Sequence, residues 1–260
     1  MRAPHSRPQA SRLPTGTSQM HIRNGSSSAY TVPGVATPFP VWVLAALLGL
    51  ALLFVMFLRV LTFGFERLGF APWHVVAIIG ASLLGSAVNI PVRTYVTEAT
   101  HTAAVRLLFG FRHRVRVEPG RRTVLAVNLG GCVVPVVVSG LLMARCPACW
   151  PSAVLSVAAC AVVVNRVAWI VKGEGIVVPF FLPPLAGAIA ATLFPPVFSQ
   201  EAFAPVVAYV AGSIGTLVGA DLLNLRYIRV IGAPMASIGG AGTWDGIFLS
   251  GIVASVLVPS

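Results

Sequence analysis

The strongest constraint on this chain is a series of apolar blocks, each about 20 residues long and almost free of charged side chains. The hydrocarbon core of a bilayer, about 30 Å thick, is crossed by about 20 residues of α-helix. Runs this long and continuously apolar are typical of helices rather than of barrel strands. The sequence predicts an all-α membrane protein with about seven transmembrane helices, at residues 41–58, 73–92, 123–144, 152–171, 176–194, 203–223 and 235–258.

Composition separates the chain into two parts. Hydrophobic residues make up 57% of it and charged residues 10%, which excludes an ordinary soluble domain. Residues 1–40 are instead rich in Ser, Pro, Thr and Arg and show no apolar periodicity, so they predict a disordered cytoplasmic tail. Residues 41–258 are predicted to form a single polytopic transmembrane domain.

The basic residues predict the orientation of the chain. Most of the 18 Lys and Arg residues lie in the tail, in the loop 93–122 and in two shorter loops on the same predicted side. Arg59, Arg67 and Arg145 lie on the other side. The positive-inside bias therefore predicts a cytoplasmic amino terminus, an outside carboxyl terminus and an odd number of spans in a bacterial or archaeal cytoplasmic membrane. Because this distribution explains the net charge of +11, no nucleic-acid partner is expected.

The loop 93–122 is the longest predicted between two spans. Its segment RVRVEPGRRTVLAV alternates Val with Arg around a Pro-Gly turn, which predicts a β-hairpin. Its charge is suited to anionic lipid at the membrane surface. The alternative is that the basic charge of the loop only retains the loop in the cytoplasm. The sequence leaves the oligomeric state open.

The four cysteines fall into two pairs. Cys132 and Cys160 lie within predicted spans, where a thiol most often packs as a small apolar group. Cys146 and Cys149 lie in a short loop predicted to face outward, and they could close a small disulfide if that side is oxidising. A redox role for the CxxC pair is the alternative.

Glycine and proline interrupt several predicted spans. Such breaks are tolerated in membranes where neighbouring groups or a cavity satisfy the freed backbone, and they often mark binding sites. The alternative is close packing of helices through small residues. Small residues recur every four positions in the last predicted span, at Gly242, Gly246, Ser250 and Ala254, and this ridge could face the similar ridge of Ala211, Gly215 and Gly219 in the sixth span. The residues assigned to breaks or packing are Gly130, Gly131, Pro135, Gly239, Gly240, Gly242 and Gly246.

Polar residues in the spans gather in the predicted cytoplasmic half. Unpaired acids in a membrane are costly, so they are functional candidates by default, and Asp221 and Asp245 are the predicted catalytic pair. Asp221 could instead pair with a nearby arginine, and each asparagine could be a hydrogen bond between helices. No metal and no cofactor are expected. The residues predicted to bind substrate or ion are Asn89, Asn128, Asn224, Ser237 and Thr243.

Five segments carry a resemblance to a known family: GSAVNIPV, AVNLGGCVVPVVVS, GEGIVVPFFLPPLAG, AYVAGSIGTLVGADLLNL and ASIGGAGTWDGIFLSGIVA. Together they resemble the membrane-protein family known as domain of unknown function 1614, over residues 72–258. The resemblance implies a multi-span architecture and brings no activity with it.

A more distant likeness concerns the two acids. Asp221 and Asp245 lie on consecutive antiparallel spans, the second in a Gly-rich run, which is similar to intramembrane aspartyl proteases of the presenilin and prepilin peptidase type. That likeness implies two carboxyl groups that share one proton and activate a water. The chain departs from the pattern, because Gly242 lies one residue too early, no Tyr or Trp precedes Asp221, and a Pro-Ala-Leu motif is missing.

Three functions follow from these residues. The first is an intramembrane hydrolase with an aspartyl diad, and the second is an ion-coupled carrier that uses the same acids. The third is a scaffold without catalysis. A regular helix would point Asp221 away from the face expected to pack on the last span, so the diad requires the segment GADLLN to unwind.

Overall fold

The computed structural model describes residues 39–96, 101–106, 112–117, 122–171, 175–231, 233–240 and 246–259. The chain divides into two units, with the boundary between Leu47 and Leu48 inside the first helix. The second unit contains every described strand and every other described helix. Almost all of the predicted tail lies outside the described residues.

Apolar helical segments follow one another in the order that the sequence predicts. Three are long and apolar enough to cross a membrane, at Val41–Arg67, Pro147–Val167 and Glu201–Tyr227. The predicted series of apolar helices is therefore confirmed, while their crossing of a membrane and the number of crossings stay predictions. The α-helices are α1 (Phe39–Arg67), α2 (Pro72–Ser86), α3 (Val134–Arg145), α4 (Trp150–Val167), α5 (Leu182–Leu193), α6 (Ala204–Val210), α7 (Ile228–Ile231) and α8 (Gly246–Leu257).

Shorter helical turns extend or join these helices. Two π-helical turns, η5 and η6, continue α6, and a third, η1, leads into α3. The turns are η1 (Leu129–Val133), η2 (Pro147–Cys149), η3 (Pro195–Phe198), η4 (Glu201–Phe203), η5 (Ala211–Gly215), η6 (Leu217–Asp221) and η7 (Leu222–Tyr227).

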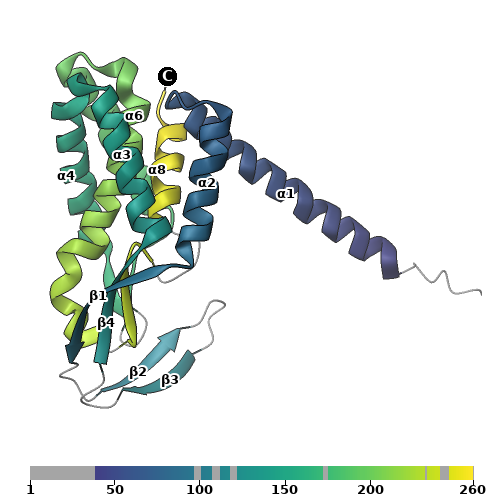
Figure 1. Ribbon diagram of the computed structural model, residues 1–260, viewed down its shortest axis with the longest axis vertical. Coiled ribbons are helices and arrows are strands. Elements are labelled where there is room, and N and C mark those ends of the chain that lie inside the picture. The colour runs from purple at the N-terminus through teal and green to yellow at the C-terminus, as the bar shows by residue number, and fades with distance from the viewer. Residues whose placement is uncertain are drawn as a thin grey trace, which may run out of the picture. The chain divides into compact units, whose positions relative to one another are not determined.

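A small sheet lies at one end of the helices (Figure 1). It consists of β1 (Asn89–Val96), β4 (Arg122–Asn128) and β7 (Met235–Ile238), in the order β1-β4-β7. β1 pairs antiparallel with β4, and β7 pairs parallel with it. The all-α prediction is wrong here, since one end of each of the second, third and seventh predicted spans is a strand. A short apolar run cannot be assigned to helix or strand by periodicity alone.

The predicted hairpin is also paired differently. β2 (His101–Arg106) pairs with β3 (Arg112–Val117), whereas β4, the expected partner of β3, lies between β1 and β7. The segments in which Val alternates with polar residues do form strands, but local alternation does not specify which strand each one pairs with. Two further short strands, β5 (Trp169–Val171) and β6 (Gly175–Val177), form a separate antiparallel pair.

Aromatic rings tie the first helix to the last. The ring of Phe65 on α1 lies 6.0 Å from that of Tyr209 and 5.9 Å from that of Phe248, and all three side chains are fully buried. Beside them, Nη1 of Arg67 donates to the carbonyls of Ser255, Val256 and Val258 at 2.9, 3.1 and 2.9 Å. The end of α8 therefore has its carbonyls satisfied by α1.

Glycines allow close helix contacts, but not all of those predicted. A Cβ on Gly212 would lie 2.6 Å from the Ser250 carbonyl and 2.9 Å from the Ala254 Cβ, so α8 does use its small residues against the sixth span. Gly215 and Gly219 instead face α4, which corrects the predicted ridge. The π-helical turns explain the difference, because each adds about one residue per turn and rotates the faces.

Candidate functional site

Asp221 lies where the sixth span departs from regular α-helix. It ends the π-helical turn η6, and the 3-10 turn η7 begins at the next residue. The segment GADLLN is therefore not a regular α-helix. This is the local condition that the likeness to aspartyl proteases required.

Two asparagines satisfy the backbone just before Asp221. Asn224 Nδ2 donates to the carbonyls of Gly219 and Ala220 at 3.0 and 2.9 Å. Asn165 Nδ2, from α4, donates to the Gly219 carbonyl at 3.1 Å. Buried carbonyls left without a partner would be costly, so these bonds stabilise the irregular turn. Asn224, predicted to bind substrate or ion, has a structural role in these contacts.

Asp221 contacts the Gly-rich segment before α8. Its Oδ2 accepts a hydrogen bond from the backbone N–H of Gly239 at 2.8 Å. Gly239 and Gly240 have φ values of 87° and 91°, a region that favours glycine. A Cβ on Gly239 would also lie 2.6 Å from the Cys132 Cβ. The two predicted break glycines thus let the main chain turn after β7 and reach the carboxylate.

Two cavities meet at Asp221. One, of about 120 Å³, is lined by β7, by Gly175 and Ile176, and by Asp221. The other, of about 190 Å³, lies between Ile176, Asp221 and the beginning of α8 at Gly246. Asp221 is partly exposed and borders both spaces. A small molecule in either cavity would therefore meet the carboxylate.

The other predicted polar ligands form a network that joins the three strands. Asn128 Oδ1 accepts from the Gly131 N–H at 2.7 Å and caps η1. Its Nδ2 donates to the Ser86 carbonyl at 2.8 Å and to Asn89 Oδ1 at 3.1 Å. Ser237 Oγ donates to the same Asn89 oxygen at 2.6 Å. The two amide oxygens that an ion would use, Asn89 Oδ1 and Asn128 Oδ1, already accept hydrogen bonds.

The break residues in the third span are packing positions. Gly130 lies against α2, where an added Cβ would meet the backbone of Ser82 and Ser86. Pro135 lies in the first turn of α3, where a missing N–H costs little. No ligand role follows for Gly130, Gly131 or Pro135 from these contacts.

Several predicted residues fall outside the described part of the chain. They are Gly242, Thr243 and Asp245, so the separation of the two acids stays a prediction. Gly246, the residue after Asp245, is described and borders the larger cavity. Among the described residues, no group of three or more His, Cys, Asp and Glu side chains could hold a metal ion.

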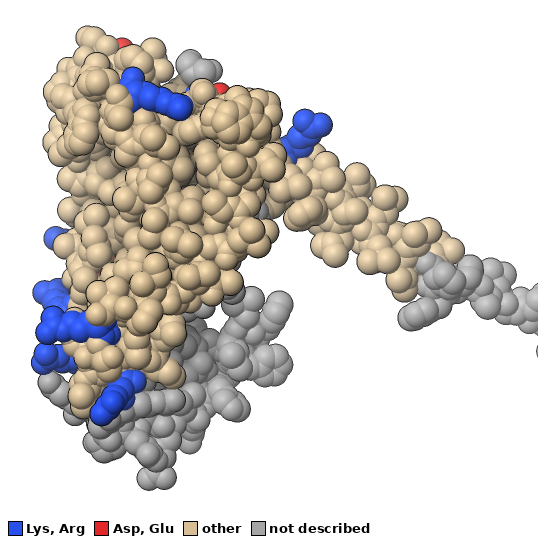
Figure 2. Space-filling view, in the orientation of Figure 1, with Lys and Arg blue, Asp and Glu red and all other residues tan. Residues whose placement is uncertain are grey.

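Basic side chains gather at the end that carries the sheet (Figure 2). The guanidinium carbons of Arg93 and Arg229 lie 5.3 and 5.9 Å from the centre of the Tyr95 ring. Arg226 lies over Tyr227 at 4.7 Å. These are cation–π contacts, and they hold the three arginine side chains at the end of the protein that carries the sheet.

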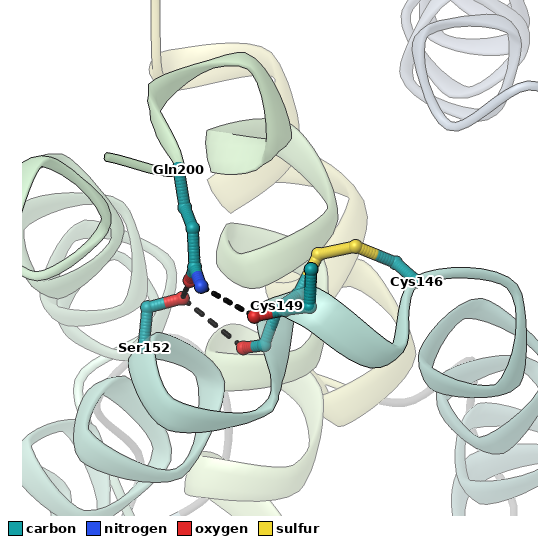
Figure 3. The surroundings of a disulfide bond; sticks show 5 residues. Cys146, Cys149, Ser152 and Gln200 are labelled. Atoms are coloured by element: carbon teal, nitrogen blue, oxygen red, sulfur yellow. Dashed lines mark hydrogen bonds between the residues drawn. A yellow bond between two sulfur atoms is a disulfide. The ribbon is translucent and has the colours of Figure 1, made fainter. Parts of the chain in front are cut away.

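A disulfide joins Cys146 and Cys149 in the turn between α3 and α4 (Figure 3). Ser152 Oγ donates to Gln200 Oε1 at 2.6 Å and to the Cys149 carbonyl at 3.1 Å. Gln200 Nε2 donates to the Ala148 carbonyl. The turn is thus attached to the η3–η4 connection, and Cys149 is fully buried. Of the two alternatives for this cysteine pair, a structural disulfide and a redox role, the structure contains the disulfide.

Sequence reasoning missed the wall opposite β7. Gly175 of β6 borders the smaller cavity and Ile176 borders both, and the sequence placed Ile176 at the start of a regular span. The Pro-rich segment after them, VPFFLPP, could have indicated that α5 begins later, because proline disfavours helix at the preceding residue. Gln200 carried no signal, since its partners, the Ser152 hydroxyl and the Ala148 carbonyl, are distant in sequence.

Apolar helices packed together and closed at one end by a small sheet indicate a protein of the membrane class. More particularly, the chain belongs to the family described as protein of unknown function (DUF1614), whose model matches residues 83–257. No curated protein and no solved structure matches it. The motif-based expectation of this family is confirmed, and the likeness to aspartyl proteases remains a hypothesis.

Proposed function

We propose that this protein is an intramembrane hydrolase in which Asp221 and Asp245 form the catalytic pair. The observation that carries the proposal is the cavity of about 190 Å³, which is bordered both by Asp221 and by Gly246, the residue that follows Asp245. The hydrogen bond from Gly239 to Asp221 supports it further, because Gly239 begins the short segment that leads to Asp245.

The chemistry needs only one water and two carboxyl groups. Like charges a few Å apart cannot both ionise, so the pair holds one proton. The ionised carboxylate removes a proton from water, whose oxygen adds to the substrate carbonyl carbon, while the other carboxyl donates its proton to the carbonyl oxygen. Collapse of this gem-diol intermediate breaks the C–N bond. The leaving nitrogen takes up the proton that came from water, and one hydroxyl of the intermediate returns its proton to the second carboxylate, which restores the pair with its single proton.

We assign the asparagines the hydrogen-bonding role that the sequence left open as their alternative. Asn89 and Asn128 fix the strands, and Asn224 fixes the turn before Asp221. In the proposed enzyme they position the catalytic acid and do not bind substrate. Ser237 belongs to the same network.

We propose that the sheet end is cytoplasmic and the disulfide end faces outward. The exposed arginines at the sheet end agree with the positive-inside bias, and a disulfide is favoured by an oxidising compartment. The catalytic cavities then open near the inner surface, where Arg93 and Arg226 can contact anionic lipid. Residues 41–258 form the transmembrane domain in this arrangement, and residues 1–40 the cytoplasmic tail.

A transition-state mimic tests the catalytic pair. A biotinylated peptide with a hydroxyethylene group and a benzophenone places its hydroxyl where the attacked carbonyl would be. Photolabelling of the full-length protein in liposomes is expected to fall about 100-fold in Asp221→Asn and in Asp245→Asn, since such mimics bind at least that much more tightly than substrate. Glu201→Gln, which changes an exposed acid outside these cavities, is the control. Equal labelling of all four proteins would contradict the proposal.

A second candidate is an ion-coupled carrier. It is favoured by the short helices α5 and α8, which both begin beside the larger cavity. At 12 residues each they extend about 18 Å, less than the bilayer core. Proton flux into dye-loaded liposomes that stops in Asp221→Asn, without photolabelling by the mimic in the unaltered protein, would select the carrier.

A further inference from the structure

β7 is an edge strand of the sheet. The order β1-β4-β7 places β4 in the middle, so one side of β7 has no neighbour among the described strands. The pairing with β4 is parallel, with Ala236 opposite Leu125, and the Val124 N–H donates to the Pro234 carbonyl at 3.0 Å.

The free side of β7 faces Asp221. Successive residues of a strand direct their backbone groups to alternate sides, and the bond at Pro234 directs the N–H groups of Ala236 and Ile238 toward β4. The N–H groups of Met235 and Ser237 therefore point the other way. The N–H of Gly239, two residues further on, continues this side and donates to the Asp221 carboxylate.

The space beside this edge is the cavity of about 120 Å³. β7 forms one wall, and Gly175 and Ile176 of β6 form another. β6 is itself at the edge of a two-stranded sheet. Apart from Asp221 and Ser237, the side chains that border the cavity are apolar. A ligand here is offered backbone donors and acceptors about 6.6 Å apart along the strand, and an apolar surface.

We infer that the open edge of β7 binds an extended, apolar polypeptide segment as an added strand, with its backbone running past Asp221. Only another extended peptide backbone matches donors and acceptors repeated every two residues, and a lipid chain would leave them unsatisfied. The inference rests on the proposed function and names its substrate class, because the added strand brings a peptide bond beside the catalytic acid.

Photocrosslinking tests this inference separately from catalysis. The full-length protein carries Asp221→Asn, which retains an oxygen acceptor for Gly239, and a photoreactive benzoylphenylalanine replaces Met235. Leu155, exposed on α4 to a similar extent, is the matched control position. The probe is a biotinylated decapeptide of alternating valine and alanine, in liposomes. Crosslinking is expected at position 235 and not at 155.

Backbone changes give the second arm. N-methylation of alternate peptide amides removes donors and keeps the side chains, and binding is expected to weaken about fivefold for each lost hydrogen bond. In the protein, Ser237→Pro removes an edge N–H, whereas Ser237→Ala removes only the hydroxyl that bonds Asn89. Crosslinking is expected to fall in the proline variant and to persist in the alanine variant, with size-exclusion chromatography confirming that both are folded.

Three results would overturn the inference. They are equal crosslinking of the methylated and unmethylated peptides, equal crosslinking at positions 235 and 155, and a covalent dimer of the protein formed without peptide, which would assign the edge to a second copy. Peptide capture at position 235 in a protein that the transition-state mimic does not label would keep the docking edge and reject the hydrolase.

Discussion

The Asp221 carboxylate and the Gly239 backbone N–H are hydrogen-bonded at 2.8 Å, although 18 positions separate them in the chain. The bond connects the end of the sixth span with the turn that leads into α8. The environment of the acid therefore depends on the backbone of that turn, and changes to the turn should reach Asp221.

Glycine at position 239 should be required for stability. Gly239→Ala places a side chain at a φ of 87° and against Cys132, which should lower the free energy of unfolding by about 2–5 kcal/mol. Gly246→Ala is the matched control, since a Cβ there meets no atom within 4 Å. Thermal unfolding followed by fluorescence would measure both. A Gly239→Ala protein as stable as the Gly246→Ala protein would contradict the described turn.

Cysteines at positions 221 and 245 should form a disulfide if the two acids are neighbours. The bond requires Cα atoms about 4.4–6.8 Å apart. The double variant would be made with Cys132 and Cys160, both buried, changed to alanine. Mild oxidation followed by mass spectrometry would detect the new crosslink. A protein that is folded and gives no 221–245 crosslink would reject the diad.

Asn128 should stabilise the fold and not bind an ion. Asn128→Ala removes the cap on η1 and two donated hydrogen bonds, so a loss of about 2–3 kcal/mol is expected. Ser237→Ala, which removes one bond to Asn89, should cost about 1 kcal/mol. Unfolding would be measured with and without sodium and potassium. Stabilisation by either ion that disappears in Asn128→Ala would show that the carrier-type prediction was right.

The disulfide should contribute stability without contributing to catalysis. Replacing Cys146 and Cys149 by serine should lower the free energy of unfolding by about 2 kcal/mol, and labelling by the transition-state mimic should not change. Maleimide treatment of the unreduced, unfolded protein is expected to modify Cys132 and Cys160 alone. Modification of four cysteines would show that the bond does not form.

Hydrophobic length predicted the helices well because lipid imposes one strong requirement on the backbone. It failed at the ends of the predicted spans that form the sheet, where residues such as Val124 and Ala236 lie in strands. Those strands are specified by partners far away in sequence, and apolar runs of this length suit either structure.

The sequence predicted the candidate site only in part. Asp221 stood out as an acid in an apolar segment. Asn128 stood out equally, yet the structure uses it as a cap and a strand tie, because composition cannot distinguish a satisfied amide from a free one. The wall formed by Ile176 was invisible, since apolar lining residues resemble any others in a membrane protein.

The contact between Arg67 and the end of α8 has a consequence for biosynthesis. Among the described helices α1 is synthesised first and α8 last, so the three carbonyls that Arg67 binds are made only after the other described helices. Until then the guanidinium must remain solvated at the membrane surface. Closure of the bundle is therefore a late event, and a chain that stops short of Val258 leaves that charge without its final acceptor.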